Sequence, residues 1–225
     1  MALIFFLESS AKISLISVIS VQKNAGLSSY LVTMNPLLLD IPDTFESERL
    51  TIRVPRAGDG AEVNAAIVES INELRPWMAL AQSIPAPEEF EARCRQAWAD
   101  FLARKDIPLF AYLKGTHTQV VSSGLHRMDW DVPKFEIGYW VRTRFAGQGY
   151  ITEAVNAITH FAFETLHANR LEIYMDDLNE KSWRVAERAG YRLEAVIRND
   201  QRTPEGRLRD TRLYAKIRLP DGSIA

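Results

Sequence analysis

The sequence predicts one domain of mixed α+β type over residues 45–220. Three consecutive strands, at residues 109–113, 120–127 and 135–141, are joined by short polar turns, which is the pattern of a meander. Segments with apolar residues at helical spacing lie before and after the meander. No internal repeat or low-complexity linker divides the chain, so a single α+β domain is expected.

One strand and two helices are predicted ahead of the meander. Residues 50–54 alternate apolar and polar side chains and end at Pro55, which indicates a short strand. A second helix opens at Pro87, because proline suits a first helical turn and the two glutamates after it favour the positive end of the helix dipole. Apolar residues at helical spacing predict the first helix, ahead of a break at 75–78: Val63, Ala66, Ile67, Ile71 and Leu74.

The chain after the meander is predicted to alternate helices and strands. A helix should run from Gly149 to about Leu166, and a strand should follow at residues 171–175. A short helix at residues 182–189 is closed by Gly190, a residue type that commonly ends helices. The final strands are predicted at residues 191–197 and 211–218.

Composition excludes several classes of protein. The chain has 225 residues, of which 47% are hydrophobic and 25% charged, which argues against wholesale disorder, collagen and coiled coil. Its net charge of −2 provides no overall positive field, so direct binding of nucleic acid is not expected. Cys94 is the only cysteine, which excludes internal disulfides and is typical of a reducing, cytoplasmic compartment. The four histidines lack metal-ligand spacing, so no metal site is expected.

Residues 1–44 differ from the rest and are interpreted as an N-terminal extension, poorly ordered. The apolar runs within residues 1–33 are too short for a membrane span, which needs about 20 apolar residues. The first lysine follows the apolar start, contrary to a secretory signal, so neither membrane insertion nor export is expected. Met34 is a candidate for the true start, and a genuine tail is the alternative.

The strongest chemical signal is the glycine-containing stretch 144–154, between a predicted strand and a predicted helix. Gly147 and Gly149 let the backbone approach a ligand closely, and the helix start offers free N–H groups and a positive dipole end. This arrangement favours a phosphate or pyrophosphate. Thr152 stands where a dinucleotide fingerprint needs its third glycine, and no Lys-Ser or Lys-Thr pair follows as in a P-loop. A plain tight turn is the alternative.

Further motifs lie before and after this loop in the sequence. Glu136-Ile137-Gly138-Tyr139-Trp140 precedes it, and Asn179-x-x-Ser182 with Ala189-Gly190-Tyr191 follows. With the segments at 48–50 and 75–78, these motifs resemble the GNAT acyl-CoA-dependent N-acetyltransferases, and most of all the ribosomal-protein serine/alanine N-acetyltransferase branch. The resemblance covers roughly residues 45–218. It implies a central mixed, mostly antiparallel, twisted sheet flanked by helices, with a splay between its fourth and fifth strands.

The same resemblance implies how acetyl-CoA would bind as co-substrate. The strands at 135–141 and 171–175 should part, so that the pantetheine arm pairs with the backbone near Tyr139, Trp140 and Val141. Asn179 and Ser182 should lie beside the pantetheine and thioester end. The pyrophosphate should lie on the loop, whose residues with an implied role are Arg144, Ala146, Gly147, Gln148, Gly149, Tyr150, Ile151 and Thr152.

Two catalytic residues are implied. Many members of this superfamily protonate the departing thiolate with a tyrosine, but Ala186 occupies that position here, so Ser182 is the candidate acid. Its alternative role is that of a hydroxyl in the first turn of a short helix. Glu136 is the candidate base, acting through water. An α-amino group has a reference pKa of about 7.7 to 8.0, so a weak base, or none, would suffice for an N-terminal substrate.

The acceptor site is less well defined by the sequence. The resemblance places Arg75, Trp77 and Met78 at the substrate pocket, although Trp77 could equally be a core residue, and His126 at the end of its strand could touch substrate. Basic residues outnumber acidic ones between Lys181 and Arg218, which could attract coenzyme phosphates or simply form a solvated face.

These observations lead to three functional hypotheses. The leading one is transfer of acetyl from acetyl-CoA to a primary amine, most of all the α-amino group of a protein such as a ribosomal protein, by direct attack in a ternary complex. The second is acetylation of a small amine, such as an antibiotic or a polyamine. The third is a non-catalytic acyl-CoA sensor, which the alanine at position 186 keeps open. The chain could be a monomer or a homodimer.

Overall fold

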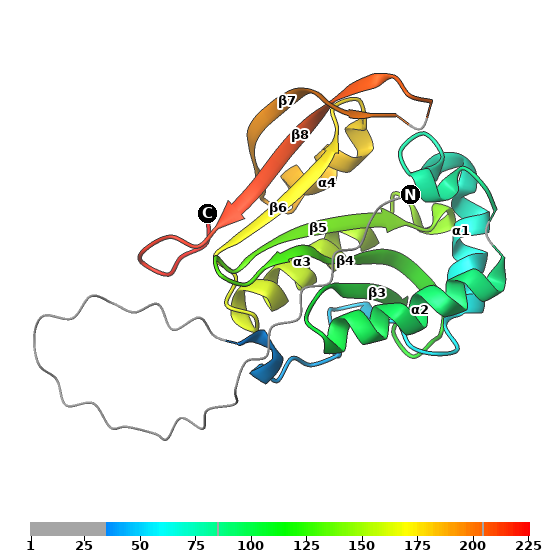
Figure 1. Cartoon of the computed structure of the whole chain (residues 1–225), viewed down its shortest axis with the longest axis horizontal. Helices are drawn as coiled ribbons and strands as arrows, with labels where there is room; N and C mark the ends of the chain where they lie inside the picture. The colour runs from blue at the N-terminus through cyan, green and yellow to red at the C-terminus, as the bar shows by residue number, and fades with distance from the viewer. Residues whose placement is uncertain (1–34, 85, 204) are drawn as a thin grey trace, which may run out of the picture. The chain divides into compact units, whose positions relative to one another are not determined.

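The computed structural model describes residues 35–84, 86–203 and 205–225, and the interpretation of residues 1–33 and Met34 lies outside this part of the chain. Its strands form one mixed sheet in the order β1-β2-β3-β4-β5-β6-β8-β7 (Figure 1). The strands are β1 (Thr44–Glu46), β2 (Leu50–Arg53), β3 (Ile107–Leu113), β4 (Gln119–Asp129), β5 (Lys134–Val141), β6 (Arg170–Asp176), β7 (Arg192–Arg202) and β8 (Leu208–Ile217).

Helices cover both faces of this sheet. The helix α3 packs behind the central strands, whereas α1 and α2 lie across the opposite face, beside each other (Figure 1). Each face has its own hydrophobic cluster, the larger around α3 and the smaller between α1, α2 and Trp140 of β5. The helices are α1 (Gly60–Leu74), α2 (Pro87–Leu102), α3 (Tyr150–Glu164) and α4 (Glu180–Arg188), with short 3-10 turns η1 (Pro36–Leu38), η2 (Ala79–Ala81) and η3 (Thr143–Phe145).

The predicted α+β class is confirmed, and so are the predicted elements apart from their ends. Pro87 is the first residue of α2, with Glu88 and Glu89 in its first turn. Gly190 follows the end of α4 with a φ of 76°, and the Tyr191 N–H returns to the Ala186 carbonyl, which closes the helix as expected. The strand β1 was not predicted, because three residues that pair only with β2 leave too short a pattern.

The splay in the sheet is confirmed, between β5 and β6. These two strands run parallel, and they pair only from Lys134 to Glu136 against Arg170 to Glu172. Beyond Glu136, β5 remains paired with β4, and β6 remains paired with β8. The sheet is therefore held together on both sides of a wedge-shaped opening that starts at Glu136.

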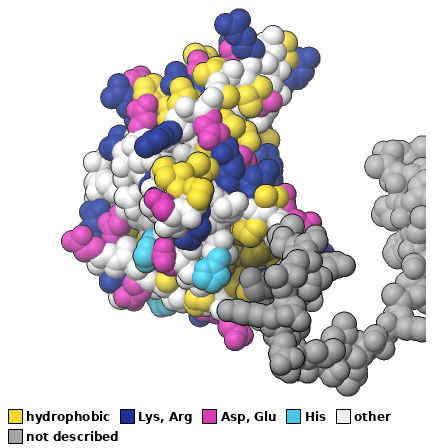
Figure 2. Space-filling view, turned by 90° about the vertical axis from the view of Figure 1, so that its left-hand side faces the viewer, with side chains coloured by type: hydrophobic (Ala, Val, Ile, Leu, Met, Phe, Trp, Pro, Cys, Tyr) yellow, Lys and Arg dark blue, Asp and Glu magenta, His cyan; other side chains and the backbone are white. Residues whose placement is uncertain are grey.

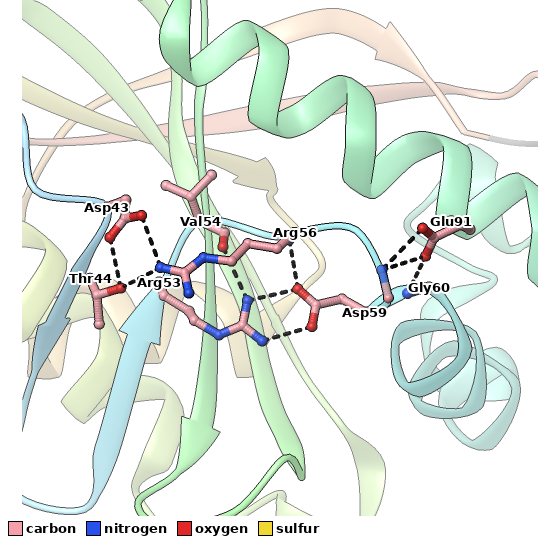
Figure 3. A network of polar contacts seen from close by, with 9 residues as sticks. Asp43, Thr44, Arg53, Val54, Arg56, Asp59, Gly60 and Glu91 are labelled. Atoms are coloured by element: carbon pink, nitrogen blue, oxygen red, sulfur yellow. Dashed lines mark hydrogen bonds and ion pairs between the residues drawn. The ribbon is translucent and has the colours of Figure 1, made fainter.

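An ion-pair network fixes the first helix pair to the edge of the sheet (Figure 3). Arg53 of β2 forms a two-pronged contact with Asp59, at 2.7 Å for each pair of atoms. The carboxylate of Glu91 in α2 accepts from the backbone N–H groups of Gly58 and Gly60, at the start of α1. The starts of α1 and α2 are thus held against each other and against β2.

The face of the molecule in Figure 2 has no dominant charge. On the face shown in Figure 2, acidic and basic side chains are intermixed around a group of hydrophobic ones, in keeping with the small net charge. None of the described helices combines the length and the apolar character that a bilayer span requires.

Candidate active site

The loop between β5 and α3 presents a row of backbone N–H groups. Gly149 is the N-cap of α3 in the left-handed conformation, with a φ of 84°, and contributes no side-chain cap. Within the described residues, none of the backbone N–H groups from Gly147 to Thr152 has a hydrogen-bond partner; the first return bond of the helix comes from Glu153 to the Gly149 carbonyl. These donors and the positive end of the helix dipole suit a pyrophosphate, so the residues present fit this part of a coenzyme.

A brace that the sequence did not reveal holds this loop in place. Arg49, just before β2, donates through Nε to Glu153 at 2.6 Å and through Nη1 to the Gln148 carbonyl at 3.1 Å. Its guanidinium also lies 4.1 Å from the centre of the Tyr150 ring. This contact could not be predicted, because Arg49 and Glu153 are 104 positions apart in the sequence. Arg49 does belong to one of the segments that carry the family resemblance. The brace ties the loop to the start of β2, and the Glu153 carboxylate offsets the Arg49 charge there.

Arg144 does not extend along the loop. Its Nε lies 3.6 Å from a carboxylate oxygen of Glu69 in α1, and its backbone N–H donates to the other oxygen of that carboxylate at 3.2 Å. A second basic group comes from α4, where Arg188 reaches the Thr152 hydroxyl at 3.5 Å. A role for Arg144 in charge neutralisation stays a prediction, since it requires the side chain to leave Glu69.

Backbone groups of β5 face the splay. Arg142 donates to the Val120 carbonyl at 2.8 Å, so the even-numbered residues of β5 bond to β4, and the odd-numbered ones direct their N–H and C=O groups away from it. Tyr139 and Val141 therefore present free backbone groups to the opening, whereas Trp140 bonds to β4 and its side chain is nearly buried under α1 and α2. An extended ligand could pair along this edge like an added strand.

The candidate acid Ser182 lies across this opening from Tyr139. The Tyr139 hydroxyl donates to the Ser182 carbonyl at 2.9 Å, and burial raises the pKa of Tyr139 to about 12, so the phenol stays protonated. Asn179 is the N-cap of α4, its side chain accepting from the Ser182 N–H at 3.2 Å. Within the described residues the Ser182 hydroxyl has no partner, because Asn179 and Tyr139 use only its backbone.

A cavity of about 370 Å³ opens on the other side of β5, under α1 and α2. Of the predicted substrate residues, Met78 and His126 line it, whereas Arg75 is exposed and Trp77 half-buried outside its wall. Burial raises the pKa of the Cys94 thiol in this wall to about 12, so the thiol remains protonated there. The wall also contains Val63, Ile67, Phe90, Arg93, Phe110, Ser122, Gly138, Tyr139 and Trp140.

Glu136 lies at the vertex of the splay, opposite His126 in the β4–β5 register. Burial raises the pKa of its carboxyl, although the neighbouring Arg127, which donates to it, acts in the opposite direction. The structure therefore brings Glu136, His126 and Tyr139 to one end of the opening, where the cavity and the free edge of β5 meet.

Comparison with known proteins identifies the family. The family model for the acetyltransferase (GNAT) domain matches residues 49–192, which contain the loop, the splay and the start of α4. This chain belongs to the GNAT acetyltransferases. It is therefore an acetyl-CoA-dependent N-acetyltransferase, and the resemblance stated from the motifs is confirmed.

Individual GNAT relatives are distant in sequence. A protein of Bacillus subtilis (strain 168) named "putative ribosomal N-acetyltransferase YdaF" is 29% identical over 154 residues, covering 68% of this chain and 83% of that protein. The ribosomal-protein-S5-alanine acetyltransferase from Vibrio fischeri has a TM-score of 0.70 at 20% identity, covering 80% of this chain and 98% of the other. The microcin C7 self-immunity acetyltransferase MccE, solved with acetyl-CoA and AMP, has a TM-score of 0.70 at 23% identity, covering 76% and 93%.

Proposed function

We propose that this enzyme transfers the acetyl group of acetyl-CoA to the α-amino group of a protein, of the kind found at the N-terminus of ribosomal proteins. The proposal rests on the position of Tyr139, where the free edge of β5 meets the cavity. One side of β5 offers free backbone groups for an extended coenzyme arm, and the other side forms a wall of the cavity. The names of YdaF and of the Vibrio fischeri enzyme support a protein acceptor.

The chain's own residues define the roles in this proposal. The N–H groups of Gly147 to Thr152 hold the pyrophosphate, and the free edge of β5 at Tyr139 and Val141 aligns the pantetheine arm. Ser182 hydrogen-bonds the coenzyme sulfur and delivers a proton as the thiolate leaves. Glu136 lies at the vertex of the splay with its carboxylate paired to Arg127, so it is not free to bind the incoming amine directly.

Thiol release from acetyl-CoA tests this function. The assay offers peptides with N-terminal alanine or serine, the same peptides with a blocked N-terminus, lysine, and polyamines. Release with free N-termini only is the expected result. Release with polyamines alone would assign a small-molecule acetyltransferase, and binding of acetyl-CoA without release for any amine would assign a sensor.

The loop is tested separately by the change Gly149→Val. A β-branched residue cannot adopt a φ of 84° without strain, and its Cβ would come 3.4 Å from the Arg49 guanidinium. We expect acetyl-CoA binding to be lost in calorimetric titration while the fold is retained. Gly222→Val is the matched control, since this glycine has a similar φ of 85° far from the loop. Unchanged affinity in Gly149→Val would contradict the proposed loop.

A further inference from the structure

His126 lies in the wall of the cavity, over two glycines that leave room for its ring. Gly124 of β4 and Gly138 of β5 stand opposite each other in the sheet. A Cβ at Gly124 would come 2.7 Å from Cε1 and 2.8 Å from Nε2 of His126, and a Cβ at Gly138 would come 3.4 Å from its Cδ2. The imidazole therefore packs over this glycine pair, where a Cβ at Gly124 would displace it, and it forms part of the cavity wall.

A carboxylate fixes the orientation of this ring. His126 Nδ1 lies 2.8 Å from Oδ1 of Asp106, the residue just before β3, and both side chains are about one third exposed (35% and 31%). Because an ionised carboxylate can only accept a hydrogen bond, Nδ1 carries the proton in the neutral ring, and Nε2 keeps its lone pair. Nε2 lies over the glycine pair, 2.8 Å from the Cβ position of Gly124 and 3.6 Å from that of Gly138, and His126 is part of the cavity wall.

Charged side chains from several elements surround the ring. Asp106 contacts the ring directly, and Glu136 faces it from β5. Arg127, the residue next to His126, is engaged by Glu136, and Arg93 of α2 lies in the cavity wall. Asp106 is thus the carboxylate in direct contact with His126, whereas Glu136 is paired with Arg127.

We propose that His126 is the catalytic base that takes the proton of the acceptor ammonium, and that Asp106 is a positioning residue that aims it. This inference deepens the proposed function and rests on it. Glu136 is less suited to first contact with the amine, because Arg127 already occupies its carboxylate. In this arrangement Asp106, in contact with Nδ1, also stabilises the imidazolium that forms.

Each proton in the proposed reaction has a donor and an acceptor. The ammonium gives one proton to Nε2 of His126, and the neutral amine nitrogen then bonds to the thioester carbonyl carbon. As the C–S bond breaks, a second proton leaves the nitrogen and reaches the thiolate through the Ser182 hydroxyl. The products are the amide and the free thiol of CoA, and the imidazolium returns its proton to water.

The test compares His126→Gln, Asp106→Asn and the parent enzyme by thiol release, with the acceptor that the amine panel identifies. We expect His126→Gln to lower kcat by about 10²-fold while KM for acetyl-CoA is unchanged. Asp106→Asn should lower kcat by a smaller factor, since the ring is still present. His160→Gln is the matched control, because His160 is exposed on α3 away from the cavity, and its kcat should equal that of the parent.

A second readout separates a base from a structural residue. An N-terminal alanine peptide is compared with the same peptide carrying trifluoroalanine, whose amine is already neutral near pH 7. The ratio of kcat between parent and His126→Gln should shrink toward one for the fluorinated peptide, because no proton has to be removed first. An equal ratio for both peptides would reduce His126 to a structural role and overturn the proposal.

The outcomes distinguish this proposal from the function on which it rests. Parent-like kcat in a folded His126→Gln variant would overturn the base assignment and leave the acetyltransferase standing. A parent enzyme that binds acetyl-CoA but releases no thiol with any amine would overturn both. Nitrogen NMR of the full chain adds a test without turnover: the His126 signals should show Nδ1 protonated and Nε2 free, and the opposite tautomer would also overturn the proposal.

Discussion

At the scale of single residues, Ser182 is held through its backbone, and within the described residues its hydroxyl has no hydrogen-bond partner. Asn179 fixes its backbone N–H, and Tyr139 fixes its carbonyl across the opening between β5 and β6. Both contacts hold the residue in place without using the side chain. The alanine at position 186, buried on the same helix, leaves α4 without a phenol there, so Ser182 carries the hydroxyl of this helix that we propose for proton transfer.

The change Ser182→Ala should lower kcat far more than it weakens acetyl-CoA binding. Proton delivery matters only as the thiolate leaves, so a loss of about 10²-fold in kcat with little change in coenzyme affinity is expected. Steady-state kinetics and calorimetric titration measure the two effects. Lys181→Ala, at the exposed preceding position, is the control. Equal kcat in Ser182→Ala and parent would remove this residue from the mechanism.

At the scale of elements, the cavity under α1 and α2 depends on how these two helices are attached to the sheet. Arg53 and Asp59 join β2 to the start of α1, and each side chain is only 15% exposed. Asp59 also accepts from the Arg56 N–H at 2.6 Å, which shapes the turn between strand and helix. The neighbouring pair of Arg56 and Asp43 is more exposed, at 47% and 34% (Figure 3).

These two pairs allow a matched comparison. Asp59→Ala leaves the Arg53 charge without a partner in a poorly hydrated position, so a loss of about 3 kcal/mol in the free energy of unfolding is expected. Asp43→Ala breaks an exposed pair and should cost less than about 1 kcal/mol. Urea unfolding of both variants measures the difference. Similar losses in the two would show that burial does not set the strength of the Arg53–Asp59 contact.

At the scale of the whole molecule, burial of thiol and phenol groups makes the free energy of unfolding depend on pH in the alkaline range. Burial raises the pKa of Cys94 from 9.0 to about 12 and that of Tyr139 from 10.0 to about 12, and it also raises the pKa of Tyr112 and Tyr191. Burial lowers the pKa of Lys216 and of Arg104, which act in the opposite sense. The folded chain therefore retains more protons than the unfolded chain between about pH 9 and 12, because the raised thiol and phenols outnumber these two groups.

The free energy of unfolding should accordingly fall as the pH rises from about 9 toward about 12. The raised groups favour the folded state fully below their unfolded pKa values, and this contribution is lost as the pH passes through the folded ones. Urea titrations over this range measure the slope, and Cys94→Ala should make it shallower at its lower end. A free energy of unfolding that is constant or rises across the range would contradict the buried state of these groups.

Much of the fold follows from local patterns. The meander, the long helix after the loop and the closure of α4 by Gly190 were all predicted, because each depends on residues that are neighbours in the chain. The loop at Gly147 and Gly149 was predicted for the same reason: its free N–H groups belong to consecutive residues. Short β1 had too few residues to produce a pattern.

Contiguous residues and fixed spacings define the α+β class, the glycine turn before α3 and the GNAT motifs, so these could be predicted from the sequence. Which side chains meet depends on the tertiary structure. The contact between Asp106 and His126 joins residues twenty positions apart, and that between Arg49 and Glu153 joins residues 104 positions apart. Such pairs arise from strand register and helix packing, which bring distant segments together by burial of apolar surface and leave no periodic trace in the sequence.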